Sequence, residues 1–126
     1  MDLIIGGAYQ GKKHFALEQF KIHENEWIDG RLCEYEELQH AKGIHHLQDY
    51  IKRLLLEERE PMAYILEQVE MNQDAVILCN ELGCGLVPMD AFDRRYRELV
   101  GRIQCELAKR ANSVYRVYCG IGVKIK

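Results

Sequence analysis

The chain has 126 residues, of which 48% are hydrophobic and 29% are charged, and its formal net charge is −3. This length and this composition are typical of one folded globular domain, and they exclude a disordered chain. This net charge gives no argument for nucleic acid or an anionic membrane as the main partner. We therefore expect residues 1–126 to form a single domain that binds neither.

The apolar runs and the cysteines indicate where such a protein works. The longest apolar runs, such as residues 75–79, have five residues, far fewer than the ~20 that a membrane-spanning helix needs. The first residues lack the basic, apolar and cleavage regions of an export signal. The five cysteines form no CxxC pair and no zinc spacing with histidine. We expect a cytoplasmic protein with reduced thiols.

The clearest motif lies near the start of the chain, where a short apolar strand at residues 3–5 runs directly into a glycine-rich loop. The loop follows the phosphate-binding pattern G-x-x-x-x-G-K-[ST], in which small residues let backbone amides converge on an anion at a helix N-terminus. We expect Lys12 to contact the transferring phosphates and to act in catalysis. The expected nucleotide-binding residues are Gly6, Gly7, Ala8, Tyr9, Gln10, Gly11, Lys12 and Lys13.

Lys13 departs from this pattern, because it stands where the pattern has Ser or Thr. The hydroxyl at that position normally binds the Mg²⁺ that the nucleotide phosphates carry, and an ammonium group has no lone pair for a metal. Two interpretations stay open. Either Lys13 points to solvent and Mg²⁺ is held by water and the nucleotide, or metal-dependent turnover is lost.

The segments that follow the loop predict alternating helices and strands. Residues 12–20 have apolar positions at helical spacing, and residues 26–30 predict a short strand that ends in a turn. Residues 34–42 are polar and predict a short helix or an ordered loop, broken at Gly43. Residues 46–58 predict a helix with one buried face, formed by Leu47, Tyr50, Ile51, Leu54 and Leu55.

The second half continues this alternation. Pro61 favours the start of a helix that runs to about residue 71, and residues 75–79 predict a strand covered on both faces. Asp90 is expected to cap a long helix that ends near residue 111. Residues 114–119 predict the last strand. This order predicts an α/β, P-loop NTPase-like fold: a three-layer sandwich with a small, mostly parallel sheet of about four to five strands flanked by helices.

Two segments carry a resemblance to a known family. One is the loop at residues 5–12, and the other is Cys-Asn-Glu-Leu-Gly-Cys-Gly-Leu-Val-Pro at residues 79–88. The chain resembles, as a short and divergent member, the adenosylcobinamide kinase / adenosylcobinamide-phosphate guanylyltransferase family. Members of that family have a Gly-Gly phosphate loop on the first strand and a later strand that ends in Asn-Glu. The similarity continues through Arg94, Tyr96, Arg97, residues 101–102 and residues 120–126.

The resemblance implies a kinase of cobalamin biosynthesis. Such an enzyme would transfer the γ-phosphoryl group of ATP or GTP, with Mg²⁺, to the hydroxyl of the cobinamide aminopropanol arm. It also implies a homo-oligomer. The alternative is a catalytically degenerate nucleotide-binding or regulatory protein of the same fold. The choice between ATP and GTP and the phosphoryl acceptor stay open.

Two carboxylates compete for a role in binding metal-bound water or the acceptor. Glu81 ends the most buried strand, where P-loop proteins keep such a carboxylate. Asp29 ends the second strand. The alternative roles are a cap or a salt bridge for Glu81 and turn formation before Gly30 for Asp29.

The histidine pair at residues 45–46 is the candidate for the family's guanylylated histidine, with His46 as the nucleophile. In the family an Arg-Pro step follows that histidine, whereas here Leu-Gln-Asp-Tyr follows. We therefore do not expect guanylyl transfer. The alternative for both histidines is a cap or a surface position at the start of a helix.

Overall fold

The computed structural model describes residues 1–82 and 90–126. Across this part of the chain, six strands form one sheet in the order β2-β3-β4-β1-β5-β6. Strands β1 to β5 pair in parallel, and β6 pairs with β5 in the antiparallel sense. The strands are β1 (Asp2–Gly6), β2 (Trp27–Asp29), β3 (Gly43–His45), β4 (Val76–Asn80), β5 (Ser113–Tyr118) and β6 (Ile121–Lys124).

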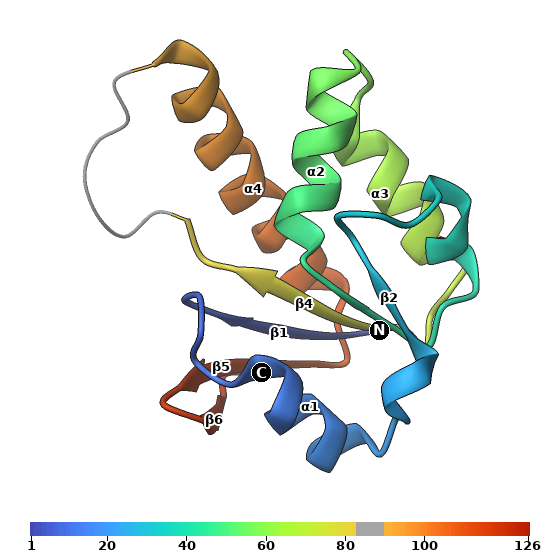
Figure 1. Cartoon of the computed structure of the whole chain (residues 1–126), viewed down its shortest axis with the longest axis vertical. Coiled ribbons are helices and arrows are strands. Elements are labelled where there is room, and N and C mark those ends of the chain that lie inside the picture. The colour runs from blue at the N-terminus through green and yellow to red at the C-terminus, as the bar shows by residue number, and fades with distance from the viewer. Residues whose placement is uncertain (83–89) are drawn as a thin grey trace.

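Helices cover both faces of this sheet (Figure 1). One face carries α1, and the other carries α2, α3 and α4. Side chains alternate along β1 accordingly: Leu3 packs into the core under α2 to α4, and Ile4 packs into the core with Ala16 of α1. The helices are α1 (Lys12–Phe20), α2 (Leu47–Leu56), α3 (Pro61–Glu70) and α4 (Ala91–Arg110). The predicted three-layer, P-loop NTPase-like fold is confirmed.

Two strands were not predicted, so the expected number of four to five was too low. β3 has Ile44 as its only apolar side chain, so it shows little pattern, and Gly43 is part of it rather than a break. A side chain at Gly43 would lie 2.5 Å from the Trp27 ring, which explains the glycine. In β6, Ile121 and Val123 alternate with Gly122 and Lys124 at the spacing of a strand, but both apolar side chains are exposed and the strand has only four residues.

The helix boundaries agree with the sequence patterns. Pro61 opens α3, and the Asp90 carboxylate accepts hydrogen bonds from the backbone N–H groups of Phe92 at 2.7 Å and Asp93 at 3.2 Å. Both were predicted. The part of the second family segment that spans residues 83–88 lies outside the described residues. Within residues 1–82 and 90–126, no helix combines the length and the apolar character that spanning a membrane requires.

The sheet also determines where a site can form. Because β1, β2, β3 and β4 run parallel, their carboxyl ends lie at one edge of the sheet. In such sheets, ligands bind outside this edge. Asp29 and His45 are the last residues of β2 and β3, and the glycine-rich loop, His46 and Glu81 directly follow strand ends.

Candidate active site

The glycine-rich loop joins β1 to α1 and is held by the turn between β5 and β6. Gly11 caps α1 in the left-handed conformation with φ 85°, which favours glycine. Gln10 accepts two hydrogen bonds from that turn, through its backbone oxygen from Gly120 N and through Oε1 from Cys119 N, both at 2.7 Å. The side chain of Gln10 therefore anchors the loop, and its backbone and that of its neighbours remain the candidate phosphate ligands.

The two lysines of the loop point to different partners. Lys12 curls back over the loop, and its Nζ donates to the Gly7 carbonyl at 2.7 Å. Burial lowers the pKa of Lys12, while the charge of Glu81 opposes this shift. Lys13 instead reaches the surface and pairs with Glu24 at 2.7 Å. The ammonium group of Lys12 thus lies over the loop, whereas that of Lys13 forms an ion pair with Glu24 outside the loop.

A cavity of about 510 Å³ lies beside the loop. The loop and the start of α1 contribute residues 8–14 to its wall. The ends of β2 and β3 and the first turn of α2 contribute Arg31, His45, His46, Gln48 and Asp49. Glu81 is not among its lining residues. The cavity is large enough for a small-molecule ligand.

Each of the two predicted carboxylates has an arginine partner. Asp29 Oδ1 accepts from Arg31 Nε at 3.0 Å and Oδ2 accepts from Nη2 at 2.8 Å. The hydrogen bonds from Arg31 lower the pKa of Asp29 to about 2. Glu81 Oε2 lies 2.9 Å from Arg116 Nη2. Both alternatives are seen here: Glu81 forms a salt bridge, and Asp29 Oδ1 also accepts from the backbone N–H of Arg31 at 2.9 Å, which is a turn contact.

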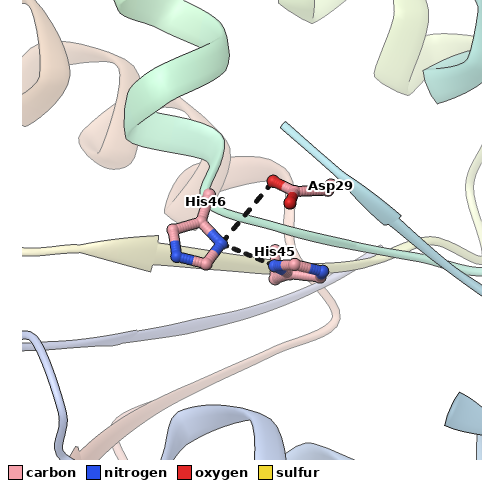
Figure 2. A group of neighbouring side chains, drawn as sticks. All are labelled: Asp29, His45 and His46. Atoms are coloured by element: carbon pink, nitrogen blue, oxygen red, sulfur yellow. Dashed lines mark hydrogen bonds and ion pairs between the residues drawn. The ribbon is translucent and has the colours of Figure 1, made fainter. Parts of the chain in front are cut away.

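The histidine pair lies at the junction of β3 and α2, next to Asp29 (Figure 2). His45 ends β3, so it is not part of the helix start, and His46 is the N-cap residue of α2. The side chain of His46 makes no capping hydrogen bond. The two Nδ1 atoms lie 2.5 Å apart, and His46 Nδ1 lies 3.8 Å from Asp29 Oδ1. Burial lowers the pKa of both histidines, which favours neutral rings.

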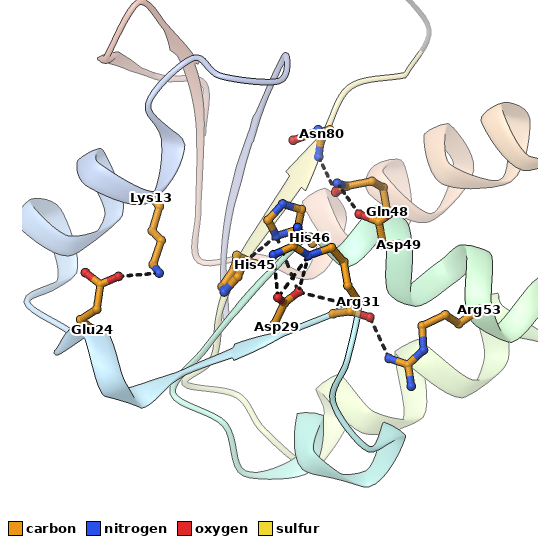
Figure 3. Close-up of polar contacts among 11 residues, drawn as sticks. Lys13, Glu24, Asp29, Arg31, His45, His46, Gln48, Asp49, Arg53 and Asn80 are labelled. Carbon is orange, nitrogen blue, oxygen red and sulfur yellow. Dashed lines mark hydrogen bonds and ion pairs between the residues drawn. The ribbon is translucent and has the colours of Figure 1, made fainter.

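The sequence patterns did not reveal a third group, Gln48 and Asp49 in the first turn of α2 (Figure 3). Gln48 is 5% exposed. Its Oε1 accepts from the backbone N–H of Asn80 at 3.0 Å, and its Nε2 donates to Asp49 Oδ2 at 3.1 Å. Gln48 therefore orients a carboxylate that lines the cavity. No local signal pointed to them, because the strand that precedes them, β3, was not predicted from the sequence.

We expect Gln48→Ala to lower the free energy of unfolding by about 1–3 kcal/mol, because the Asn80 N–H loses its buried acceptor. Urea unfolding measures this difference. The control is Gln19→Ala, since Gln19 is exposed and its amide reaches only the Tyr115 hydroxyl at 3.3 Å. The control should change stability by less than about 0.5 kcal/mol. If both variants change the free energy of unfolding equally, the hydrogen bond from Asn80 to Gln48 does not stabilise the fold.

Comparison with known proteins gives a family. The family model described as cobinamide kinase / cobinamide phosphate guanyltransferase matches residues 27–125. The chain belongs to this family. The matched segment begins at β2, after the glycine-rich loop, so the loop and the match are separate observations. The predicted resemblance is confirmed.

Two relatives of the cobinamide kinase / guanyltransferase family share a shorter segment with the chain. The bifunctional adenosylcobalamin biosynthesis protein CobU of Escherichia coli is 47% identical over 51 residues, and its counterpart from Salmonella typhimurium is 45% identical over 51 residues. These segments cover 40% of this chain but 28% of each relative. The aligned part is thus a minor share of either relative.

Proposed function

We propose that this protein is a cobinamide kinase that transfers the γ-phosphoryl group of ATP or GTP to the aminopropanol hydroxyl of cobinamide. The observation that carries the proposal is the position of Lys12, which lies over a glycine-rich loop beside a cavity of about 510 Å³ in a member of this family. The proposed partners are the nucleotide and the cobinamide substrate.

Each group around the cavity has a proposed role. The backbone amides of residues 7–13 bind the phosphates at the N-terminus of α1. Lys12 stabilises the charge that spreads over the transferring phosphoryl group. Glu81, whose charge opposes the lowering of the Lys12 pKa, favours the charged form of that lysine. Asp49, oriented by Gln48, accepts a hydrogen bond from the acceptor hydroxyl and positions it.

The residues present do not fit a Mg²⁺ ion held in the usual way of such loops. Lys13 supplies no hydroxyl, and its ammonium group is paired with Glu24. The Glu81 carboxylate is paired with Arg116, and Asp29 lies beside two histidines, whose nitrogen atoms are not the ligands that Mg²⁺ prefers. For this reason no step of the proposed reaction passes through Mg²⁺.

Phosphorylation of cobinamide tests this function directly. The protein is incubated with cobinamide and either ATP or GTP, with and without Mg²⁺, and the corrinoid is analysed by mass spectrometry. We expect a product that is heavier by one phosphoryl group and that requires Lys12. Nucleotide binding without this product would contradict the kinase and support the second candidate below.

The second candidate is a nucleotide-binding or regulatory protein without efficient turnover. The pairing of Lys13 with Glu24 favours it, because the position that normally binds the metal is occupied by an engaged ammonium group. Guanylyl transfer through His46 remains the less favoured activity. Incubation with α-labelled GTP tests this activity, because a guanylylated His46 would carry an acid-labile label. The homo-oligomer and the cytoplasmic location also remain predictions, and sedimentation velocity tests the first.

We expect Lys13→Ser to raise Mg²⁺-dependent phosphoryl transfer about tenfold or more, because a hydroxyl can bind the metal. Loss of the exposed pair with Glu24 should cost at most about 1 kcal/mol of stability. Initial rates with and without Mg²⁺ measure the effect. Lys13→Ala is the control, since it removes the ammonium group and supplies no hydroxyl. If both variants behave alike, the missing hydroxyl does not limit the reaction.

A further inference from the structure

Three side chains at the edge of the cavity form a compact group of metal-ligand atoms (Figure 2). One ligand atom each from Asp29, His45 and His46 lies within 4.8 Å of the other two. All three side chains are partly buried, and both histidines line the cavity beside the glycine-rich loop. None of the roles proposed above for the kinase reaction uses this group.

The backbone brings these side chains together. Asp29 and His45 are register partners in the parallel pair of β2 and β3, so their side chains point to the same face of the sheet. Gly30 extends the pairing, because its N–H donates to the His45 carbonyl at 2.8 Å. His46 then adopts the left-handed conformation with φ 60°. This conformation is uncommon for a residue with a side chain, and such residues cluster at functional sites.

The ligand atoms of the group lie close enough together to bind one shared ion. The two Nδ1 atoms face each other at 2.5 Å, and Asp29 Oδ1 lies 3.8 Å from one of them. Around a tetrahedral Zn²⁺ with bonds of about 2.0–2.1 Å, ligand atoms lie roughly 3.3 Å apart. Small rotations of these side chains would give that spacing. Arg31 donates to both carboxylate oxygens of Asp29, and metal-binding carboxylates are commonly hydrogen-bonded in turn.

We propose that Asp29, His45 and His46 bind one first-row transition-metal ion, such as Zn²⁺ or Co²⁺, and leave its remaining coordination positions open to the cavity. Two imidazoles and one carboxylate suit such ions, whereas Mg²⁺ prefers oxygen ligands alone. An ion bound there would present a positive centre to anionic oxygens that enter the cavity. The proposal does not depend on the kinase activity.

Metal titration of the untagged full chain tests the proposal without any nucleotide. After treatment with a chelator and its removal, the protein is titrated with Zn²⁺ by calorimetry and with Co²⁺ by visible absorption. We expect one ion per chain, and a Co²⁺ spectrum with d–d bands but without the near-ultraviolet band of a thiolate ligand. His45→Ala, His46→Ala and Asp29→Asn should each weaken binding by about 10-fold to 100-fold or more.

Matched variants separate this site from other metal-binding groups. His40→Ala should leave the affinity unchanged, because His40 lies outside the group and does not line the cavity. Replacing the exposed thiols of Cys105 and Cys119 with Ser should also leave it unchanged. Circular dichroism and thermal melting establish that each variant is folded, and His45→Gln replaces His45→Ala if the latter is not. Absence of binding, binding insensitive to all three ligand variants, or a thiolate band in the Co²⁺ spectrum would overturn the proposal.

Discussion

Replacing Lys12 with Ala is expected to weaken the binding of ATP or GTP by about 10-fold to 150-fold. This factor corresponds to the loss of one hydrogen bond to a charged group, which contributes about 1.5–3 kcal/mol. The Lys12 ammonium group lies at the loop and has the Gly7 carbonyl as its hydrogen-bond partner at 2.7 Å. A triphosphate in the loop would offer that half-buried charge much stronger acceptors. Isothermal titration calorimetry or displacement of a fluorescent nucleotide measures the affinity.

The adjacent lysine is the matched control for this experiment. Lys13→Ala removes the same charge one residue further along, but that charge is paired with Glu24 at the surface. We expect this variant to change the affinity by no more than about threefold, as screened surface charges contribute little. If the two variants lose affinity equally, a general electrostatic attraction explains binding. If Lys12→Ala binds as the parent does, the loop is not the nucleotide site.

Gly30→Ala is expected to lower the free energy of unfolding by about 2–4 kcal/mol, within the range of strongly destabilising substitutions. A side chain on Gly30 would lie 2.3 Å from the His46 carbonyl oxygen and 3.0 Å from the His45 carbonyl oxygen. Backbone atoms cannot move aside as a flexible side chain can. The variant should therefore separate the end of β2 from the junction of β3 and α2, and urea unfolding measures the cost.

Gly101→Ala is the control for this substitution and should have the opposite sign. Gly101 lies within α4, and a side chain there would meet no atom within 4 Å. Alanine in a helix is favoured over glycine by roughly 0.5–1 kcal/mol, so we expect a stabilised protein. Metal titration of Gly30→Ala should also show weaker binding, since Asp29 would shift relative to the histidines. A Gly30→Ala protein as stable as the parent would contradict the close packing at this junction.

The features that could be predicted from the sequence have local signals. The loop, the helix under it and the apolar stripe of α2 each depend on residues that are close together in the chain. The capping role of Asp90 was predicted for the same reason. β3 and β6 were missed because their local signals are weak: Ile44 is the only apolar side chain of β3, and the alternating apolar residues of β6 are exposed. Their positions depend on the strands with which they pair.

The sequence by itself determined the alternation of strands and helices, the glycine-rich loop and the lysine at position 13, because periodicity and spacing are properties of the chain. Only the tertiary structure decided which side chains share the cavity. Asp29 meets the histidine pair because β2 and β3 align in parallel, and Glu81 turns to Arg116 because β4 and β5 flank β1. Such contacts join residues that are distant in the chain, and packing of the whole sheet creates them.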